Sequence, residues 1–412
     1  MRCVLGPHSM KRICTRGFKS SSGLREVVIV SAARTPFGSF MGPLKDLPAT
    51  KLGSITISSA VERAGITPEQ IEEVYMGNVL SAGMGQAPAR QAALGAGCLD
   101  TTPCTTINKV CASGMKSIML AAQSIACGAR DIMVAGGMES MSNVPMFENR
   151  TAPVYGNRVV KDGILHDGLT DAYTPGLHMG HCGEDTASTM SISRDTQDEY
   201  TVRSYNTAAA AYQSGVLRAE IVSVPTPNRK NPDLTVTDDT EYANVKFDKI
   251  PTLRTVFDKA GTITAANSSK LSDGAAACVL MSRDMADKLG LEPLAKILTM
   301  ADSAGPPIKF PIAPVRAMEL CLENLGISVE DLQRVEVNEA FAVVAVACQQ
   351  MLNIPSEIYN PNGGAISLGH PIGASGARLI GTMAHTMKSG DKGLTGICNG
   401  GGGASAVIIE KF

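Results

Sequence analysis

An internal repeat restricts the fold of this chain more than any other feature of its sequence. The tripeptide Ala-Ser-Gly occurs at 112–114 and again at 374–376. Apolar residues at helical spacing follow each copy, and then a strand-like run with glycines. Gly136 and Cys398 each lie 24 residues after the alanine of their copy. A duplicated α/β unit explains this coincidence, so the sequence predicts two similar halves.

Strand and helix patterns outside the repeat agree with this prediction. The apolar run at 26–32 predicts a buried strand, and a helix is expected near 48–64. A strand-like run at 294–300 opens the second half as 26–32 opens the first. The segment from about 143 to 252 is rich in glycine, proline and polar residues and has no counterpart in the second half. We interpret it as an insertion carried by the first half.

Composition excludes several classes of function. A chain of 412 residues accommodates two core domains, and a formal net charge of −2 offers no basic field to nucleic acid. The chain has no Trp and only 4% aromatic residues, which argues against platforms for stacking bases. No apolar run approaches the roughly 18 residues of a membrane-spanning helix. The richest run, at 341–348, is expected to be a buried core element.

The N-terminus and the cysteines indicate the compartment. Residues 1–25 are basic, contain the run Ser20–Ser22 and have no acidic residue, which is typical of a mitochondrial transit peptide. We therefore expect a matrix location and a folded chain that begins at Glu26; a disordered basic tail is the alternative. The 11 cysteines are an odd number and contain no CxxC pair, which favours reduced thiols over a disulfide framework.

Two residues suggest nucleophilic catalysis. Cys111 directly precedes Ala-Ser-Gly and an amphipathic helix, where free N–H groups and the helix dipole would lower the pKa of a thiol. His370 lies between a glycine and a proline in a turn, where it could take a proton from Cys111 and donate an N–H to a thioester oxygen. A buried helix-cap cysteine and a structural histidine are the alternatives.

Cys398 and Asn338 complete the candidate chemistry. Cys398 ends a strand just before Asn399 and four glycines, whose N–H groups could form an oxyanion hole while the thiol moves a proton at a Cα carbon. A flexible linker is the alternative. Asn338 could hold a water against a substrate oxygen, or cap a helix. No Gly-Lys-Ser or Gly-Lys-Thr follows the glycines, which excludes a phosphate loop, and the lack of paired ligand spacings argues against a zinc site.

In combination, these stretches resemble the thiolase family. They are NKVCASGMK at 108–116, GGMESMSN at 136–143, VNEAF at 337–341, GHPIGASGAR at 369–378 and CNGGGGAS at 398–405. The resemblance covers residues 26–412. It implies an α/β thiolase fold, in which two βαβαβαββ halves form a five-layered αβαβα core. Residues 26–145 and 253–295 would form the first half, 146–252 an inserted loop domain for CoA and tetramer contacts, and 296–412 the second half.

The resemblance also implies the reaction. Acetoacetyl-CoA, and 2-methylacetoacetyl-CoA, would react reversibly with CoA through an acetyl-Cys111 intermediate, as part of ketone-body and isoleucine metabolism. His370 would activate Cys111 and bind the thioester oxygen, and Cys398 would be the acid and base. Asn338 would position the water of one oxyanion hole, and the backbone N–H groups of Cys111 and Gly400 would form the other.

The resemblance assigns further residues to ligands. Those expected to contact CoA, as substrate, are His178, Met179, Tyr205, Lys249, Ser269, Phe310 and Phe341. A potassium ion would be held mainly by oxygens near Tyr205, Ala265, Ala266, Ser268 and Ile366. The chain departs from its close relatives with serine at 268 and isoleucine at 366, where they have alanine and valine. No redox or transition-metal cofactor is implied, and a homotetramer of paired dimers is expected.

Three alternatives remain at this point. A β-ketoacyl synthase shares the doubled fold but uses one cysteine with two polar partners, so Cys398 before four glycines argues against it. A broader 3-ketoacyl-CoA thiolase of fatty-acid β-oxidation has the same chemistry, and Phe310 followed by Pro311 favours the short-chain substrate. A CoA-binding relative without catalysis is the third, against which the presence of all four proposed catalytic residues argues.

Overall fold

The computed structural model describes residues 23–151, 154–227 and 231–412. Most of the predicted transit peptide, residues 1–22, lies outside these ranges. Within them, every cysteine is free, as the sequence predicted. No helix in the described ranges has the length and apolar character that crossing a membrane requires.

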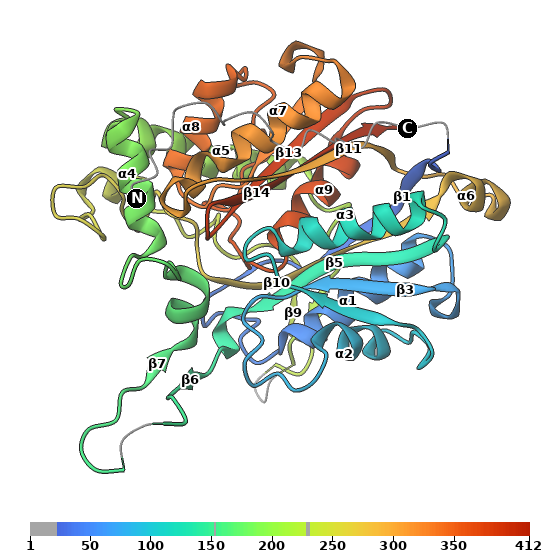
Figure 1. Cartoon of the computed structure of the whole chain (residues 1–412), viewed down its shortest axis with the longest axis horizontal. Helices are drawn as coiled ribbons and strands as arrows, with labels where there is room; N and C mark the ends of the chain where they lie inside the picture. The colour runs from blue at the N-terminus through green and yellow to red at the C-terminus, as the bar shows by residue number, and fades with distance from the viewer. Residues whose placement is uncertain (1–22, 152–153, 228–230) are drawn as a thin grey trace, which may run out of the picture.

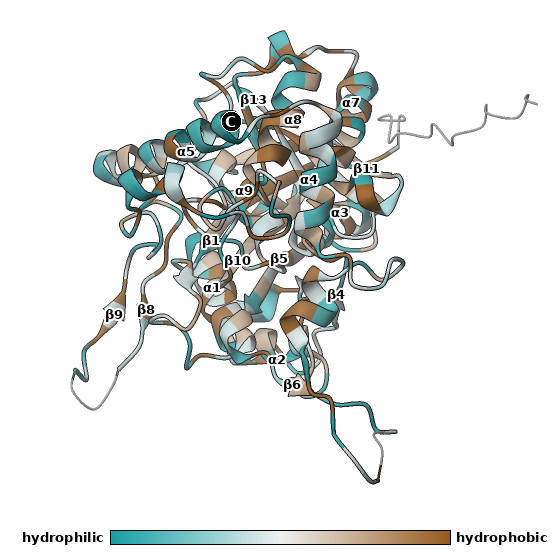
Figure 2. Cartoon of the chain, turned by 90° about the vertical axis from the view of Figure 1, so that its left-hand side faces the viewer, coloured by the Kyte–Doolittle hydropathy of each residue, from teal (hydrophilic) through white to brown (hydrophobic). Residues whose placement is uncertain are grey.

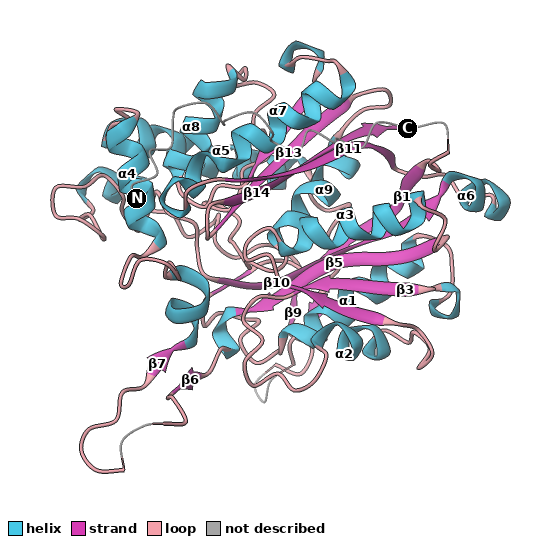
Figure 3. Ribbon diagram, in the orientation of Figure 1, coloured by secondary structure: helices cyan, strands magenta, loops and turns pink. Residues whose placement is uncertain are grey.

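A ten-stranded mixed sheet runs through the molecule (Figure 3). Its order is β12 (Arg334–Val337), β13 (Lys392–Asn399), β14 (Gly403–Lys411), β11 (Ala295–Ala304), β1 (Val27–Arg34), β10 (Ser272–Ser282), β5 (Ile132–Ser140), β3 (Glu73–Gly77) and β4 (Cys104–Ile107), with β2 (Gly38–Ser39) paired to β10. The two halves meet where β1 pairs with β11. Outward from that pair, the order β1, β10, β5, β3 repeats as β11, β14, β13, β12. The predicted duplication is therefore present in the sheet itself.

Helices complete five layers (Figure 1). Helices α3 (Ser113–Ala126) and α9 (Ser375–Thr386) pack against each other between the two parts of the sheet. Helices α1 (Ala49–Arg63) and α2 (Pro88–Gly95) share a separate core with the first half, and α7 (Ala313–Leu325) and α8 (Ala342–Leu352) share one with the second. The predicted αβαβα fold class is confirmed. The apolar run at 341–348 is buried, as expected; Phe341 is the N-cap of α8 and the rest of the run lies inside the helix.

The central layer depends on a close approach of the two halves. The carbonyl oxygen of Gly373, in the loop before α9, would lie 1.9 Å from a Cβ at Gly137 and 2.8 Å from one at Gly77 or Gly114. Only glycine leaves room for that oxygen at Gly137. Lysines also join the halves, because Lys109 and Lys116 both form ion pairs with Asp302 of β11.

The predicted insertion lies between β5 and β10, whereas only residues 400–402 separate the equivalent strands β13 and β14. It contains β6 (Met146–Phe147), β7 (Lys161–Asp162), η3 (Ile164–Leu169), α4 (Met179–Thr189), α5 (Arg194–Ser214), β8 (Val224–Pro225), β9 (Thr235–Val236) and η4 (Phe247–Thr252). The β6–β7 and β8–β9 segments extend away from the body (Figure 2). Shorter elements elsewhere are η1 (Pro68–Gln70), η2 (Met141–Asn143), α6 (Arg283–Leu289), η5 (Pro307–Ile312) and η6 (Val329–Asp331).

Candidate active site

The candidate catalytic residues gather at the C-terminal ends of parallel strands. Asn338 follows β12. Its backbone N donates to the oxygen of Gly396 at 3.0 Å, and Gly396 lies two residues before Cys398 on β13. In the first half, Asn78 follows β3 and Glu139 lies near the end of β5. Since carboxyl ends of neighbouring parallel strands share one edge of a sheet, each half contributes one such edge.

Cys111 lies in a strained turn before α3. Val110 has φ of 46°, a left-handed conformation that is unfavourable for a β-branched residue. Strained backbone of this kind clusters at functional sites. The turn is closed by Ser113 Oγ, which accepts from the N of Lys109 at 2.8 Å and donates to the oxygen of Val110 at 2.6 Å. Lys109 Nζ then reaches β14, donating to the oxygen of Ala404 at 3.0 Å. The turn that carries Cys111 is thus fixed to both halves.

The thiol of Cys111 remains protonated in the free chain. Burial raises its pKa to about 11, and the nearby carboxyl group of Glu139 also raises it. Hydrogen bonds from the backbone of Gly400 and of Cys111 itself act in the opposite direction. The expectation that the helix end lowers the pKa below its ordinary value was therefore wrong, because desolvation outweighs these dipoles. The backbone N–H groups of Cys111 and Gly400, which are the two predicted oxyanion donors, therefore both lie at the sulfur of Cys111.

His370 is buried and neutral, with a defined tautomer. Its Nδ1 lies 2.6 Å from Ser375 Oγ, whose own proton is donated to the oxygen of Pro371 at 3.0 Å. Ser375 therefore accepts from Nδ1–H, and Nε2 carries a free lone pair that faces Asn338 Nδ2 at 3.4 Å. Burial, followed by the positive charge of Arg378, lowers the pKa of His370 to about 3. Nε2 is therefore unprotonated at neutral pH and available to accept a proton.

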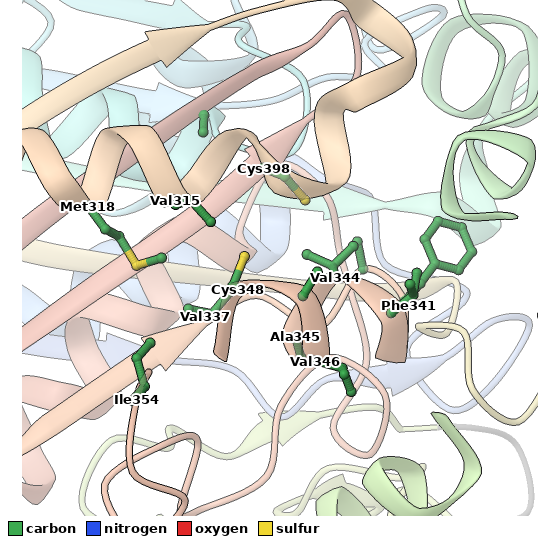
Figure 4. Close-up of a cluster of buried hydrophobic side chains, with 14 of the residues drawn as sticks. Val315, Met318, Val337, Phe341, Val344, Ala345, Val346, Cys348, Ile354 and Cys398 are labelled. Carbon is green, nitrogen blue, oxygen red and sulfur yellow. The ribbon is translucent and has the colours of Figure 1, made fainter. Parts of the chain in front are cut away.

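Cys398 is fully buried beside the same centre. It belongs to a cluster with Val344 and Cys348 of α8 (Figure 4). Burial raises the pKa of Cys398 well above its ordinary value, and the adjacent thiol of Cys111 is the next largest cause. The structure thus brings Cys111, Cys398 and Gly400 together, and it joins His370 to Asn338.

Glu139 connects these two groups and was missed by the sequence analysis. Its carboxylate accepts from Asn78 Nδ2 at 2.8 Å and from the backbone N of Val79, Leu80 and Gly373 at 3.1, 3.2 and 3.0 Å. Gly373 belongs to the loop that carries His370. Burial raises the pKa of Glu139 to about 7. The sequence does contain a signal for Glu139, because an acidic residue within an otherwise apolar and glycine-rich strand is seldom buried without a role.

Glu339 has a comparable position in the second half and was also missed. It is buried directly after Asn338. Its carboxylate accepts from Tyr200 OH at 2.9 Å, Ser204 Oγ at 2.7 Å, Asn360 Nδ2 at 3.2 Å and the N of Ile366 at 3.1 Å. These bonds fix the Asn338 turn to α5 of the insertion.

The residues predicted to contact CoA divide into two groups. Met179, Tyr205, Phe310 and Phe341 share the buried cluster of Cys398, and the sulfur of Met179 lies 3.3 Å from the position of a Cβ on Gly400. His178 caps α4 through its Nδ1, which accepts from the N of Gly180 at 3.0 Å, and its ring stacks on Phe257. Lys249 is exposed on η4, and Ser269 donates its N to the oxygen of Ala340 at 3.0 Å.

The residues predicted to hold potassium have a different cationic partner. The ammonium group of Lys270 donates to the oxygens of Ala265, Ala266 and Ser268 at 2.5, 3.2 and 2.9 Å. The hydroxyl of Tyr205 donates to Glu241 at 3.2 Å, and Ile366 donates its amide to Glu339. The predicted set therefore does not fit a potassium ion in this chain, because a lysine that the sequence analysis did not consider binds three of its oxygens.

Comparisons with known proteins agree with the motifs. Residues 27–284 match the family described as thiolase, N-terminal domain, and residues 291–411 match thiolase, C-terminal domain. The chain is 56% identical to "Acetyl-CoA acetyltransferase, mitochondrial" of Danio rerio over 100% of its own length and 98% of the relative. It is 55% identical to the Homo sapiens protein of the same description, over 97% and 94%. A crystal structure of Acat5 thiolase from Ascaris suum in complex with coenzyme A superposes with a TM-score of 0.90 at 40% identity, covering 94% of this chain and 100% of that one.

Proposed function

Since this chain belongs to the thiolase family, as its motifs predicted, we propose that it is an acetyl-CoA acetyltransferase of mitochondria. It cleaves acetoacetyl-CoA with CoA into two molecules of acetyl-CoA and also catalyses the reverse condensation. The observation that carries the proposal is the contact of Cys111 with both Cys398 and the backbone of Gly400. His370, whose Nε2 is free to act as a base, belongs to the loop that Glu139 holds through the N of Gly373. Full-length similarity to relatives described by this activity supports it.

In the first half-reaction, His370 Nε2 takes the proton of Cys111 as the sulfur attacks the keto carbon of acetoacetyl-CoA. The bond between that carbon and the neighbouring Cα breaks, and an acetyl group stays on Cys111. The electron pair of the broken bond passes to Cα, which takes the proton of Cys398, and acetyl-CoA leaves. A thiol with a raised pKa suits this step, because it keeps its proton until a carbanion forms.

In the second half-reaction, the Cys398 thiolate takes the proton of CoA. The CoA sulfur then attacks the acetyl carbon, and the sulfur of Cys111 leaves and regains its proton from His370. Two oxyanions form along this path. The N–H groups of Cys111 and Gly400 receive one of them, and His370 with a water held by Asn338 receives the other. Asn338 Oδ1 is buried without a hydrogen-bond partner among the described residues, which fits such a water.

CoA reaches Cys111 past Met179 and Phe341, with His178, Tyr205, Lys249, Ser269 and Phe310 contributing to its binding. The position of Met179 next to Gly400, whose backbone contacts the sulfur of Cys111, supports this path. The acetoacetyl and 2-methylacetoacetyl thioesters are the expected substrates, because Phe310 followed by Pro311 favours the short-chain substrate. Assembly as a homotetramer is part of the proposal.

The test follows the acetyl group directly. Cys111→Ser is expected to abolish the acetylated protein that mass spectrometry detects after mixing with acetyl-CoA. Cys398→Ala is expected to become acetylated yet to condense two acetyl-CoA very slowly. Persistent acetylation without Cys111, or unchanged condensation without Cys398, contradicts the assignment. Turnover of acetoacetyl-CoA compared with 3-ketopalmitoyl-CoA separates the proposed activity from a broad β-oxidation thiolase.

A further inference from the structure

Three backbone carbonyl groups converge on the ammonium group of Lys270. Ala265, Ala266 and Ser268 each direct an oxygen at its Nζ, at 2.5, 3.2 and 2.9 Å. A lysine ammonium has three N–H donors, so these oxygens satisfy all of them. Carbonyl oxygens grouped in this way form a pocket for a positive charge. In this chain the positive charge comes from a side chain of the same loop.

The electrostatic surroundings keep the charge in place. Burial lowers the pKa of Lys270 to about 8, and the carboxylate of Glu241 opposes that change. Glu241 is itself held by Tyr205, whose hydroxyl donates to it at 3.2 Å. With a pKa of about 8, the ammonium group is still mainly protonated at neutral pH. A second cation at the same oxygens would face it at close range, with few other charges to compensate.

The loop held by this ammonium group supports the catalytic turns. The backbone oxygen of Lys270 accepts from the N of His370 at 3.0 Å. On the other side, Asn267 accepts from the N of Ala342 at 2.8 Å, and Ser269 donates to Ala340. The loop therefore lies between the His370 turn and the turn that contains Asn338. Loss of the cation would leave three carbonyl groups without their protein partner next to both turns.

We propose that the ε-ammonium group of Lys270 is a built-in replacement for a monovalent cation, so that this enzyme neither binds nor requires potassium at the Ala265–Ser268 carbonyls. The inference deepens the proposed function, because it states which positive charge occupies this part of the same site and removes the need for an added cation. The inference rests on the proposed function only for the activity measurements, and the melting measurements test it independently.

The experiment compares three forms of the full chain by thermal unfolding. Wild type, Lys270→Ala and Lys270→Met are heated in potassium, ammonium or choline chloride at equal ionic strength. Wild type is expected to melt at the same temperature in all three salts. Lys270→Ala frees the cation position, so it should melt several degrees lower in choline and recover in potassium or ammonium. Lys270→Met removes the charge but retains the volume, so it should melt lower without recovering.

Activity provides a second readout, and an exposed lysine provides the control. In Lys270→Ala, the KM for CoA should rise severalfold in choline and return toward wild type in potassium, while Lys51→Ala, on the surface of α1, should behave as wild type in every salt. Potassium-specific stabilisation or activation of wild type overturns the proposal. A Lys270→Ala variant with the same melting temperature and the same KM for CoA in potassium and in choline also overturns the proposal. If wild type shows no thiolase turnover but the melting pattern holds, the proposed function alone fails.

Discussion

At the scale of single residues, the tautomer of His370 depends on one serine. Ser375 accepts the Nδ1 proton because its own hydroxyl is engaged by Pro371, and this leaves Nε2 free to act as a base. Ser375→Ala removes the acceptor without touching substrate. We expect kcat to fall roughly tenfold to a hundredfold with the KM for CoA nearly unchanged. Steady-state kinetics measures this, with Ser214→Ala, at the end of α5, as the control; an equal loss in both variants contradicts the positioning role.

The thiol of Cys111 gives a prediction about pH. Because burial raises its pKa to about 11, the reactive thiolate is a minor species at neutral pH and its fraction grows with pH. Alkylation of Cys111 by iodoacetamide in the free protein should therefore speed up about tenfold per pH unit between about pH 7 and about pH 10. Peptide mass spectrometry follows the adduct, in a Cys127→Ser background that removes an exposed thiol. A plateau below about pH 9 would instead support the lowered pKa that the helix-end argument predicted.

At the scale of elements, Glu139 links β5 to the loops that follow β3 and precede α9. Glu139→Gln replaces one acceptor oxygen by a donor that faces backbone N–H groups, so the free energy of unfolding should fall by about 1–3 kcal/mol. The pKa of this carboxyl rises on folding from 4.5 to about 7, so the folded state binds more protons in that window. The contribution of Glu139 to the free energy of unfolding of wild type should therefore be fully present below pH 4.5. It should be lost as the pH rises toward 7.

Urea unfolding at a series of pH values measures both effects. The Gln variant should lack the pH dependence that Glu139 contributes, whereas Glu62→Gln, exposed on α1, should retain it. Identical pH slopes in wild type and Glu139→Gln would mean that the carboxyl group does not titrate in this range.

Elements also show how far sequence reasoning extends. The patterns that predicted β1, β11, α3 and α9 succeeded because these elements are buried, so their apolar spacing is strong. Helix α5 was missed because most of its surface is polar and only one side meets the core. Glu139 and Lys270 were missed for another reason. Their roles come from carbonyl and amide groups that the fold assembles from distant segments, and no local pattern encodes such groups.

At the scale of the whole molecule, the β6–β7 segment carries apolar side chains that no part of the described chain covers. Val154, Tyr155, Val159 and Val160 are exposed there. If this segment joins dimers into tetramers, replacing Val159 and Val160 together by Asp should leave a dimer, since buried carboxylates would oppose the contact. Light scattering after gel filtration measures the mass. Activity per subunit should persist, Leu99→Asp should stay tetrameric, and a tetrameric double variant would exclude this contact.

The carbonyl oxygen of Gly373, from the second half, lies between Gly77, Gly114 and Gly137 of the first half. The two halves therefore depend on each other for the shape of the site. In the proposed mechanism, neither half contains all the catalytic residues, because Cys111 belongs to the first half and His370 and Cys398 belong to the second. If the chain is cut at the exposed turn around Gly290, turnover should return only when the two fragments are mixed.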